Sequence, residues 1–315
     1  MKNNSKLKGQ LKSLIIYIGL LLICIVFAIL NPTFISPSNL MTILSHMAPL
    51  ALMSFGLASV MMAGDFDLSL VGITGFSAVT IIVLANQFNL LVGLLGGLIV
   101  AVLVGFLNGF FVVKVGIHPW LATIAMMRMT FGLEQILSKG YAQNLNHPFI
   151  YWLGHSRIGF IPAQTIFALL IFGVMYVLIQ KHKFGYHLYA LGGNRIAAQI
   201  AGIRVQKPRI LAYMLAGVLC FFASICLTGT LSGYTPLATE KMVNDTILAV
   251  FIGSSVSKRK VINIPGTFLG VIIMGIFSNG LALIGVPSYW MQLVKGILII
   301  LVIVTSSRSE KMVQI

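Results

Sequence analysis

Ten apolar segments divide the chain, and polar or glycine-containing stretches separate them. Apolar runs of about 20 residues with few charges are typical of helices that cross a bilayer. The pattern therefore predicts an all-α fold, a polytopic membrane helical bundle of about ten transmembrane segments that occupies residues 1–315 as a single transmembrane domain. The segments lie at about 14–30, 44–63, 67–85, 90–113, 118–137, 163–180, 210–231, 243–257, 264–284 and 289–305.

The composition agrees with membrane insertion. Of the 315 residues, 58% are hydrophobic and 9% are charged, whereas a soluble domain carries about a quarter charged residues. Segment 14–30 follows a basic stretch, as in a signal peptide, but no small-residue cleavage site follows it, so we expect the first span there. Segment 243–257 is short and polar at its start, which is compatible with a re-entrant or broken helix.

The basic residues predict the orientation. With a cytoplasmic N-terminus and ten crossings, 16 of the 21 basic residues fall in cytoplasmic intervals, as the positive-inside rule requires. If segment 243–257 did not cross the membrane, Arg308 and Lys311 would lie on the outer side. Both termini and the interval 184–209 are therefore predicted to be cytoplasmic, and the net charge of +15 needs no nucleic-acid partner. The sixteen are Lys2, Lys6, Lys8, Lys12, Lys114, Lys181, Lys183, Arg195, Arg204, Lys207, Arg209, Lys258, Arg259, Lys260, Arg308 and Lys311.

The interval 184–209 is a long polar and basic stretch between two apolar segments. Asn194 can N-cap a short helix there, and Gly202 can end it in the left-handed conformation. Apolar residues recur between them at helical spacing, with Arg195 and Gln199 expected to face away. This helix could lie on the membrane surface or could dock into a soluble partner. The apolar positions are Ile196, Ala197, Ile200 and Ala201.

Few residues could carry out catalysis. The sequence contains no H-E-x-x-H, G-x-S-x-G or G-x-x-x-x-G-K-[ST] motif, so we expect no enzymatic activity, no bound cofactor and no metal site in this chain. The cysteines Cys24, Cys220 and Cys226 lie in apolar runs and are expected to be small core residues. Four glycine pairs at small-xxx-small spacing predict close helix packing. They are Gly93/Gly97, Gly105/Gly109, Gly229/Gly233 and Gly266/Gly270.

Polar residues within or at the ends of spans are candidates for a solute pathway, because buried polar groups in a membrane are costly. Each could equally form interhelical hydrogen bonds, and Asp67 and Ser69 could cap the third span. Arg128 and Glu134 lie six residues apart in one segment, so each is expected to contact another helix or the interface. The pathway candidates are Asp67, Ser69, Asn108, Thr123, Asn244, Asp245 and Asn279.

Five stretches in order resemble the monosaccharide-type (ribose-type) permeases of bacterial ABC importers. They are GDFDLSLVGITGFSA (64–78), similar to G-G-I-D-L-S-V-G; GFLNGFFVVKVGIHPWLATIAMM (105–127), similar to L-N-G…P-P-F-I-x-T-L; WLGHSRIGFIP (152–162), similar to W-L-G…G-I-P; YALGGNRIAAQIAGI (189–203), similar to Y-A-x-G-G-N-x-x-A-A-x-x-S-G-I; and SNGLALIGVPSYWMQLVKG (278–296), similar to NNGL…YWQQIVKG.

The resemblance implies a permease domain in the bacterial cytoplasmic (inner) membrane. Its implied partners are cytoplasmic ABC ATPase subunits that use ATP and Mg, an extracytoplasmic solute-binding protein, and a second permease subunit, identical or related. It also implies that 184–209 is the cytoplasmic coupling segment that meets the ATPase. The coupling residues carried over by position are Gly192, Gly193, Asn194, Ala197, Ala198 and Gly202.

Two departures from the resemblance matter. The family usually has acidic residues after G-G-N, where this chain has Arg195 and Ile196. Its I-G-G-x-S-x-x-G-G-x-G run appears here as IGSSVSKRKVINIPG (252–266), which suggests a heterodimer of two related permeases.

The first alternative function is an ATP-independent secondary transporter or channel, which would not explain interval 184–209. An intramembrane enzyme lacks a catalytic constellation.

Overall fold

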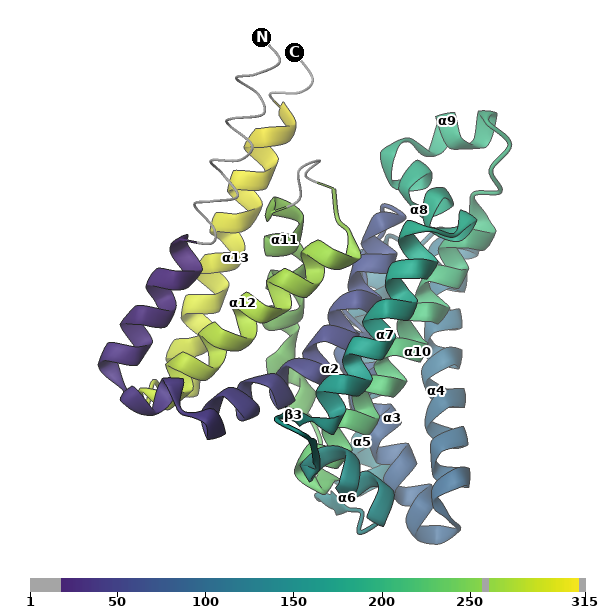
Figure 1. Cartoon of the computed structure of the whole chain (residues 1–315). Coiled ribbons are helices and arrows are strands. Elements are labelled where there is room, and N and C mark those ends of the chain that lie inside the picture. The colour runs from purple at the N-terminus through teal and green to yellow at the C-terminus, as the bar shows by residue number, and fades with distance from the viewer. Residues whose placement is uncertain (1–17, 257–260, 312–315) are drawn as a thin grey trace.

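The computed structural model describes residues 18–256 and 261–311, and most of them are helical (Figure 1). The elements follow one another along the chain as the helix Ile18–Leu30, η1 (Pro32–Ile35), α2 (Pro37–Met62), α3 (Leu70–Gln87), α4 (Leu90–Phe110), the π-helical turn η2 (Phe111–Val115), α5 (Pro119–Ser138), β1 (Gln143–Asn144), α6 (Pro148–His155), β2 (Arg157–Ile158), β3 (Ile161–Pro162), α7 (Ala163–Gln180), α8 (Lys183–Gly193), α9 (Arg195–Ile200), α10 (Gln206–Leu231), β4 (Gly233–Tyr234), η3 (Ala238–Met242), α11 (Val243–Val256), α12 (Ile264–Leu283) and α13 (Ser288–Lys311).

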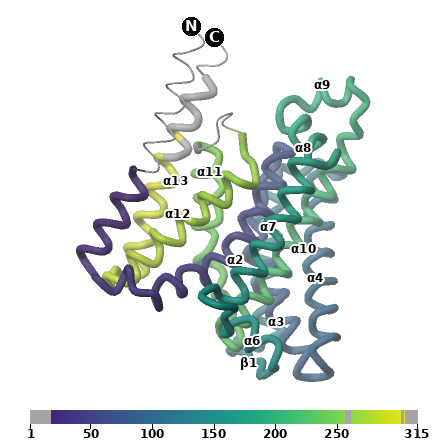
Figure 2. The backbone as a smooth tube through the Cα atoms, viewed as in Figure 1, coloured from purple at the N-terminus to yellow at the C-terminus, as the bar shows by residue number. Residues whose placement is uncertain are grey.

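Helix α2 is the central element of the bundle. It lies between a group formed by α3, α4, α5, α7 and α10 and a second group formed by Ile18–Leu30, α11, α12 and α13 (Figures 1 and 2). It contacts α10, α12, α7 and α11, and 83% of its most apolar 18-residue window is buried. A helix that is apolar on all sides must be covered by protein on all sides or by lipid, and here neighbouring helices cover α2.

The short elements lie at opposite ends of this bundle. Helices α8 and α9 project from one end, and α6 with the small strands lies at the other (Figure 1). Strand β1 pairs antiparallel with β4, with Gln143 opposite Tyr234, and β2 pairs with β3, with Arg157 opposite Pro162. Asn86 also donates a hydrogen bond to the carbonyl of Asn144, so connections from three parts of the chain meet at this end.

The four glycine pairs pack helices or strands against one another, as predicted. A Cβ atom on Gly105 would lie 2.5 Å from the carbonyl oxygen of Tyr213, and one on Gly109 would lie 3.0 Å from Cα of Ile210. Glycine at these two positions therefore allows α4 to approach the backbone of α10. Gly93 and Gly97 allow the same approach of α4 to α3, Gly229 approaches α6, Gly233 approaches Gln143, and Gly266 and Gly270 approach α11.

The ten predicted apolar segments are all helical within the described residues, so the helical fold class is confirmed. In the part of the chain that the structure describes, six helices are long and apolar enough to cross a membrane, namely α2, α3, α4 continued by η2, α7, α10 and α12. Ile18–Leu30 and the apolar part of α13 are shorter, and α11 has 14 residues. The count of ten crossings remains a prediction. Residues 14–17 and Lys258-Arg259-Lys260 lie outside the described residues.

Candidate functional site

The predicted coupling segment 184–209 contains most of α8, all of α9 and the first turn of α10, where a single short helix was predicted. Helix α8 takes up its first half, and α9 follows after Asn194. Asn194 caps α9 as expected, because its side-chain oxygen accepts a hydrogen bond of 3.0 Å from the backbone N–H of Ala197. Gly202 has φ +83°, the left-handed conformation that ends the helix. Both predicted ends of α9 are confirmed, and the helix projects from the bundle (Figure 1).

The start of the segment is fixed to α7. The backbone of Gly185 lies so close to the carbonyl of Ile179 that a Cβ atom there would clash with it. The Gln180 side chain donates a hydrogen bond of 3.3 Å to the hydroxyl of Tyr189. Burial raises the pKa of Tyr189, so its phenol stays neutral at physiological pH. Helix α8 is thereby held against the cytoplasm-facing end predicted for α7.

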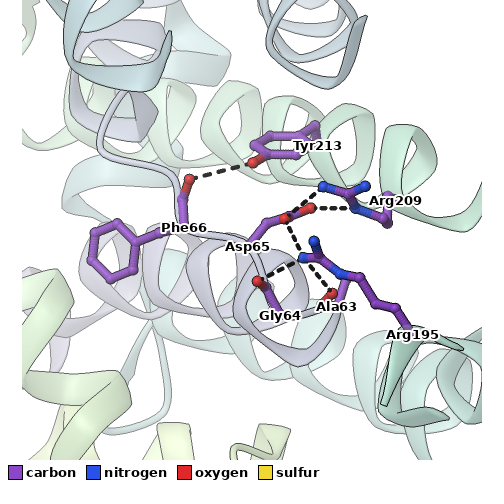
Figure 3. A network of polar contacts seen from close by, with 7 residues as sticks. All are labelled: Ala63, Gly64, Asp65, Phe66, Arg195, Arg209 and Tyr213. Atoms are coloured by element: carbon purple, nitrogen blue, oxygen red, sulfur yellow. Dashed lines mark hydrogen bonds and ion pairs between the residues drawn. The ribbon is translucent and has the colours of Figure 1, made fainter. Parts of the chain in front are cut away.

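The apolar side chains of α9 point away from the bundle. Ile196 is 73% exposed and Ile200 is 82% exposed, whereas Ala198 is buried. As predicted, Arg195 faces away from these isoleucines, and it turns toward the end of α2 (Figure 3). Helix α9 therefore presents two isoleucines outward and its arginine inward, the reverse of an amphipathic helix folded onto its own protein.

Arg195 and Arg209 hold one buried carboxylate between them, that of Asp65 in the loop between α2 and α3 (Figure 3). Nη2 of Arg195 lies 2.7 Å from Oδ1 of Asp65. Arg209, in the first turns of α10, donates from Nε to Oδ2 and from Nη2 to Oδ1, both at 2.8 Å. The Asp65 side chain has no exposed surface, while those of Arg209 and Arg195 are 10% and 41% exposed. We call this arrangement the Asp65 clamp.

The clamp is strong because the guanidinium of Arg209 meets the carboxylate with two parallel hydrogen bonds, the geometry in which Arg pairs best. It is also obligatory. A buried carboxylate without a partner would be destabilising, and so would the buried guanidinium of Arg209. Two cations around one anion leave an excess positive charge, which the partly exposed Arg195 can share with water.

The backbone around Asp65 is shaped to receive the coupling segment. Helix α2 ends at Met62, and Gly64 turns the chain with φ +78°. A Cβ atom on Gly192 would clash with the carbonyl of Met62, so only glycine allows the end of α8 to come this close. Arg195 also donates to the carbonyl of Gly64 at 2.8 Å. The predicted coupling residue Gly192 is therefore exposed on one side and packs against the end of α2 on the other.

Phe66, the next residue, ties the same loop to two more helices. Its ring stacks on that of Trp120 in α5, with centroids 4.4 Å apart. Its carbonyl accepts a hydrogen bond of 3.3 Å from the hydroxyl of Tyr213 in α10 (Figure 3). The loop from residue 63 to residue 66 thus contacts α5, the coupling segment and α10, and it joins α2 to α3.

The comparisons with known proteins agree with this architecture. The family described as the branched-chain amino acid transport system / permease component matches residues 39–303. This chain belongs to that family. The ribose import permease protein of Bacillus subtilis (strain 168) is 33% identical over 306 residues, which cover 96% of this chain and 95% of that protein. The ribose import permease protein of Escherichia coli (strain K12) is 30% identical over 300 residues, 93% of each chain. The L-arabinose ABC transporter permease protein of Azospirillum brasilense is 28% identical over 307 residues, 95% of this chain and 90% of that one.

Three of the predicted pathway residues of this permease lie together in a buried network. Oδ1 of Asp67 accepts hydrogen bonds from the N–H of Ser69 at 2.8 Å and from its hydroxyl at 2.6 Å. The Asn108 amide in α4 donates to the same hydroxyl at 2.6 Å. The capping role considered for Asp67 and Ser69 is not found: Ser69 precedes α3 without a side-chain capping bond, and its hydroxyl instead joins Asp67 to Asn108. The Thr123 hydroxyl, also buried, donates to the carbonyl of Pro119 in its own helix.

The remaining pathway candidates lie elsewhere, between α2, α11, α12 and α13. Asp245 forms an ion pair of 2.8 Å with Lys295. Asn279 exchanges two side-chain hydrogen bonds, of 3.0 and 3.1 Å, with Asn39. These contacts join helices, which is the alternative role expected for them. Asn244, which precedes Asp245, is half-buried at the start of α11.

Arg128 and Glu134 contact residues outside their own helix, as expected. Arg128 forms an ion pair of 3.1 Å with Glu240 in η3. Glu134 is fully buried, and one of its oxygens accepts a hydrogen bond from the N–H of Leu237. Both contacts hold the connection after α10 against α5. Within the described residues, no group of three or more His, Cys, Asp and Glu could hold a metal ion.

The ion pair between Asp65 and Arg209 was not predicted from the sequence. Both were visible, Asp65 inside the G-D-F-D string and Arg209 among the cytoplasmic charges. They are 144 residues apart, however, and no periodicity connects them. The available signal was the shortage of acids: a membrane chain with six acidic residues has few partners for its arginines, and each acid near a span requires one.

We expect the two arginines of the clamp to differ sharply in their effect on stability. Arg209→Leu leaves the Asp65 carboxylate buried with one partly exposed partner, so it should lower the free energy of unfolding by about 3–5 kcal/mol. Arg195→Gln keeps the bidentate pair and should cost about 1 kcal/mol or less. Thermal unfolding of the purified chain in detergent measures both. Equal losses for the two variants would contradict the clamp geometry.

Proposed function

We propose that the chain is the membrane-spanning permease subunit of an ATP-driven, binding-protein-dependent importer of a monosaccharide or similar small polar solute. The proposal rests on family membership and on relatives named as ribose and L-arabinose permeases, each aligned over at least 90% of both chains. It also rests on the long apolar helices. The observation that carries the mechanism is the projecting helix α9.

An ATPase in a separate subunit is the partner that α9 fits. The chain has no phosphate-binding loop of its own, so any ATP and Mg are used elsewhere. Helix α9 projects from the bundle and exposes Ile196 and Ile200. Apolar side chains on a short projecting helix fit a groove of a soluble subunit. Of the coupling residues carried over, Asn194 and Gly202 bound this helix, and Ala198 is its buried residue. Ala197 is exposed on α9, and Gly193 is exposed at the end of α8.

The proposed importer also includes a second permease subunit, either a copy of this chain or a relative, and an extracytoplasmic solute-binding protein. We place it in the bacterial cytoplasmic membrane with ten crossings and both termini in the cytoplasm. Contacts between distant intervals support this arrangement. Asp65 meets Arg195, both in intervals assigned to the cytoplasm, and Gln143 meets Tyr234, both in intervals assigned to the outside.

Uptake in cells tests the function. Cells that carry the gene should accumulate at least one sugar of a radiolabelled pentose and hexose panel, and deletion of the gene should abolish that uptake. Depletion of ATP with the proton gradient kept intact should stop it. Uptake that survives ATP depletion and follows an ion gradient would instead identify a secondary transporter.

Gly193→Arg in the same assay tests the docking of α9. No atom of the described chain outside its immediate neighbours lies within 4 Å of a Cβ at this position, so the permease should still fold and reach the membrane. An arginine there should block the ATPase sterically and abolish both sugar uptake and sugar-stimulated ATP hydrolysis. Normal coupling in this variant would mean that α9 lies on the membrane surface. Gly193→Ala, which adds only a methyl group in the same open space, is the matched control and should couple normally.

Cysteine labelling tests the orientation, in a background where Cys24, Cys220 and Cys226 are replaced by serine. A cysteine at Gln199, on α9, should resist a membrane-impermeant maleimide in intact spheroplasts and react in inverted vesicles. A cysteine at Arg157, on β2, should show the opposite pattern. Both positions are exposed, so access to the reagent is decided by the side of the membrane. Labelling of both from one side would refute the assigned topology.

A further inference from the structure

Arg195 provides the side-chain link between α9 and the membrane helices. Within the described residues, the side-chain hydrogen bonds from α9 to another helix or its loops all come from Arg195, and they go to Asp65 and to the backbone of residues 63 and 64. Helix α9 has six residues, and turns at Asn194 and Gly202 bound it. Without Arg195, these turns would leave α9 free to pivot against α2.

The charge of Arg195 is satisfied within the chain. Its guanidinium lies 2.7 Å from the carboxylate of Asp65 as an ion pair, and a buried carboxylate requires such a partner. Arg195 is directed toward its own permease, while Ile196 and Ile200 remain for the partner.

We propose that the Asp65–Arg195 pair is the contact that transmits movement of the docked α9 to the membrane helices, and that both are positioning residues for coupling. The inference rests on the proposed function. When the ATPase displaces α9, the force reaches the loop between α2 and α3 through this pair. Arg209 fixes the same carboxylate to α10, so α2, α3 and α10 receive the movement together.

The position of the loop explains why a movement there would reach the solute pathway. Asp65 is separated by one residue from Asp67, whose carboxylate orders the start of α3 through Ser69, and Ser69 holds Asn108 of α4. On the other side, the loop continues into α2, the central helix of the bundle. A displacement of the Asp65 backbone therefore moves elements on both sides of α2, rather than a surface loop alone.

The test is the number of solute molecules imported per ATP hydrolysed. The wild-type complex is reconstituted in liposomes together with the ATPase and binding protein that co-purify with it. The solute is the labelled sugar of the panel that the complex imports fastest. Arg195→Gln should retain ATP hydrolysis and lower the transported sugar per ATP by about tenfold, within the range of typical coupling energies. Arg195→Lys can form one bond to Asp65 and should give an intermediate ratio. Arg157→Gln, an exposed arginine far from the clamp, should keep the wild-type ratio.

Asp65→Asn provides a second measurement. Asp65→Asn removes the bond to Arg195 and also the pair with Arg209. Once Asp65 is replaced, Arg195 has no carboxylate to bind, so the double variant Asp65→Asn/Arg195→Gln should have the same sugar-to-ATP ratio as Asp65→Asn alone. If Asp65→Asn does not assemble, the Arg195 series decides alone. An unchanged ratio in Arg195→Gln overturns the inference. Loss of the ATPase from the purified Arg195→Gln complex would also overturn it, because Arg195 would then be a docking residue. A wild-type complex that imports no sugar would instead refute the proposed function.

Discussion

The two ion pairs of Asp65 determine how the end of this bundle is built. A carboxylate with no exposed surface requires cations at contact distance, since an uncompensated buried charge costs several kcal/mol. Arg209 supplies one from α10 and Arg195 supplies the other from α9. Satisfying one side chain therefore brings together the end of α2, the start of α10 and the segment between α7 and α10. The close approach of Gly192 to Met62 is possible because no side chain separates them.

Other polar groups in the bundle follow the same rule. Asp245 and Lys295 neutralise each other between α11 and α13, and Asn39 and Asn279 exchange hydrogen bonds between α2 and α12. Each pair joins two helices that otherwise meet through apolar and small side chains, where lipid offers no competing hydrogen bonds. Residues that a sequence marks as candidates for a solute pathway thus lie mainly in structural contacts. The polar groups at the Asp65 end differ because their network continues into α9, which exposes Ile196 and Ile200.

The sequence predicted the elements of this fold better than their contacts. Long apolar runs located the ten apolar segments, and capping residues located both ends of α9, because these signals depend on local sequence. Helix α8 was not predicted, since its residues are too polar to stand out and it is stabilised by α7. The direction in which the apolar face of α9 points was not predicted. Periodicity identifies its apolar face, but whether that face turns inward depends on Asp65, which lies 130 residues away.

A distance measurement between α9 and the membrane helices tests the central claim, that the Asp65–Arg195 pair makes α9 and the α2–α3 unit move as one body. One spin label is attached at Gln199 and one at Gln87, the last residue of α3, in a chain whose three cysteines are replaced. Both positions are exposed. Pulsed electron paramagnetic resonance on the assembled complex, with and without ATP and vanadate, should give a narrow distance distribution in each state. With Arg195→Gln, the distributions should broaden. Distributions of equal width with and without Arg195 would contradict the account.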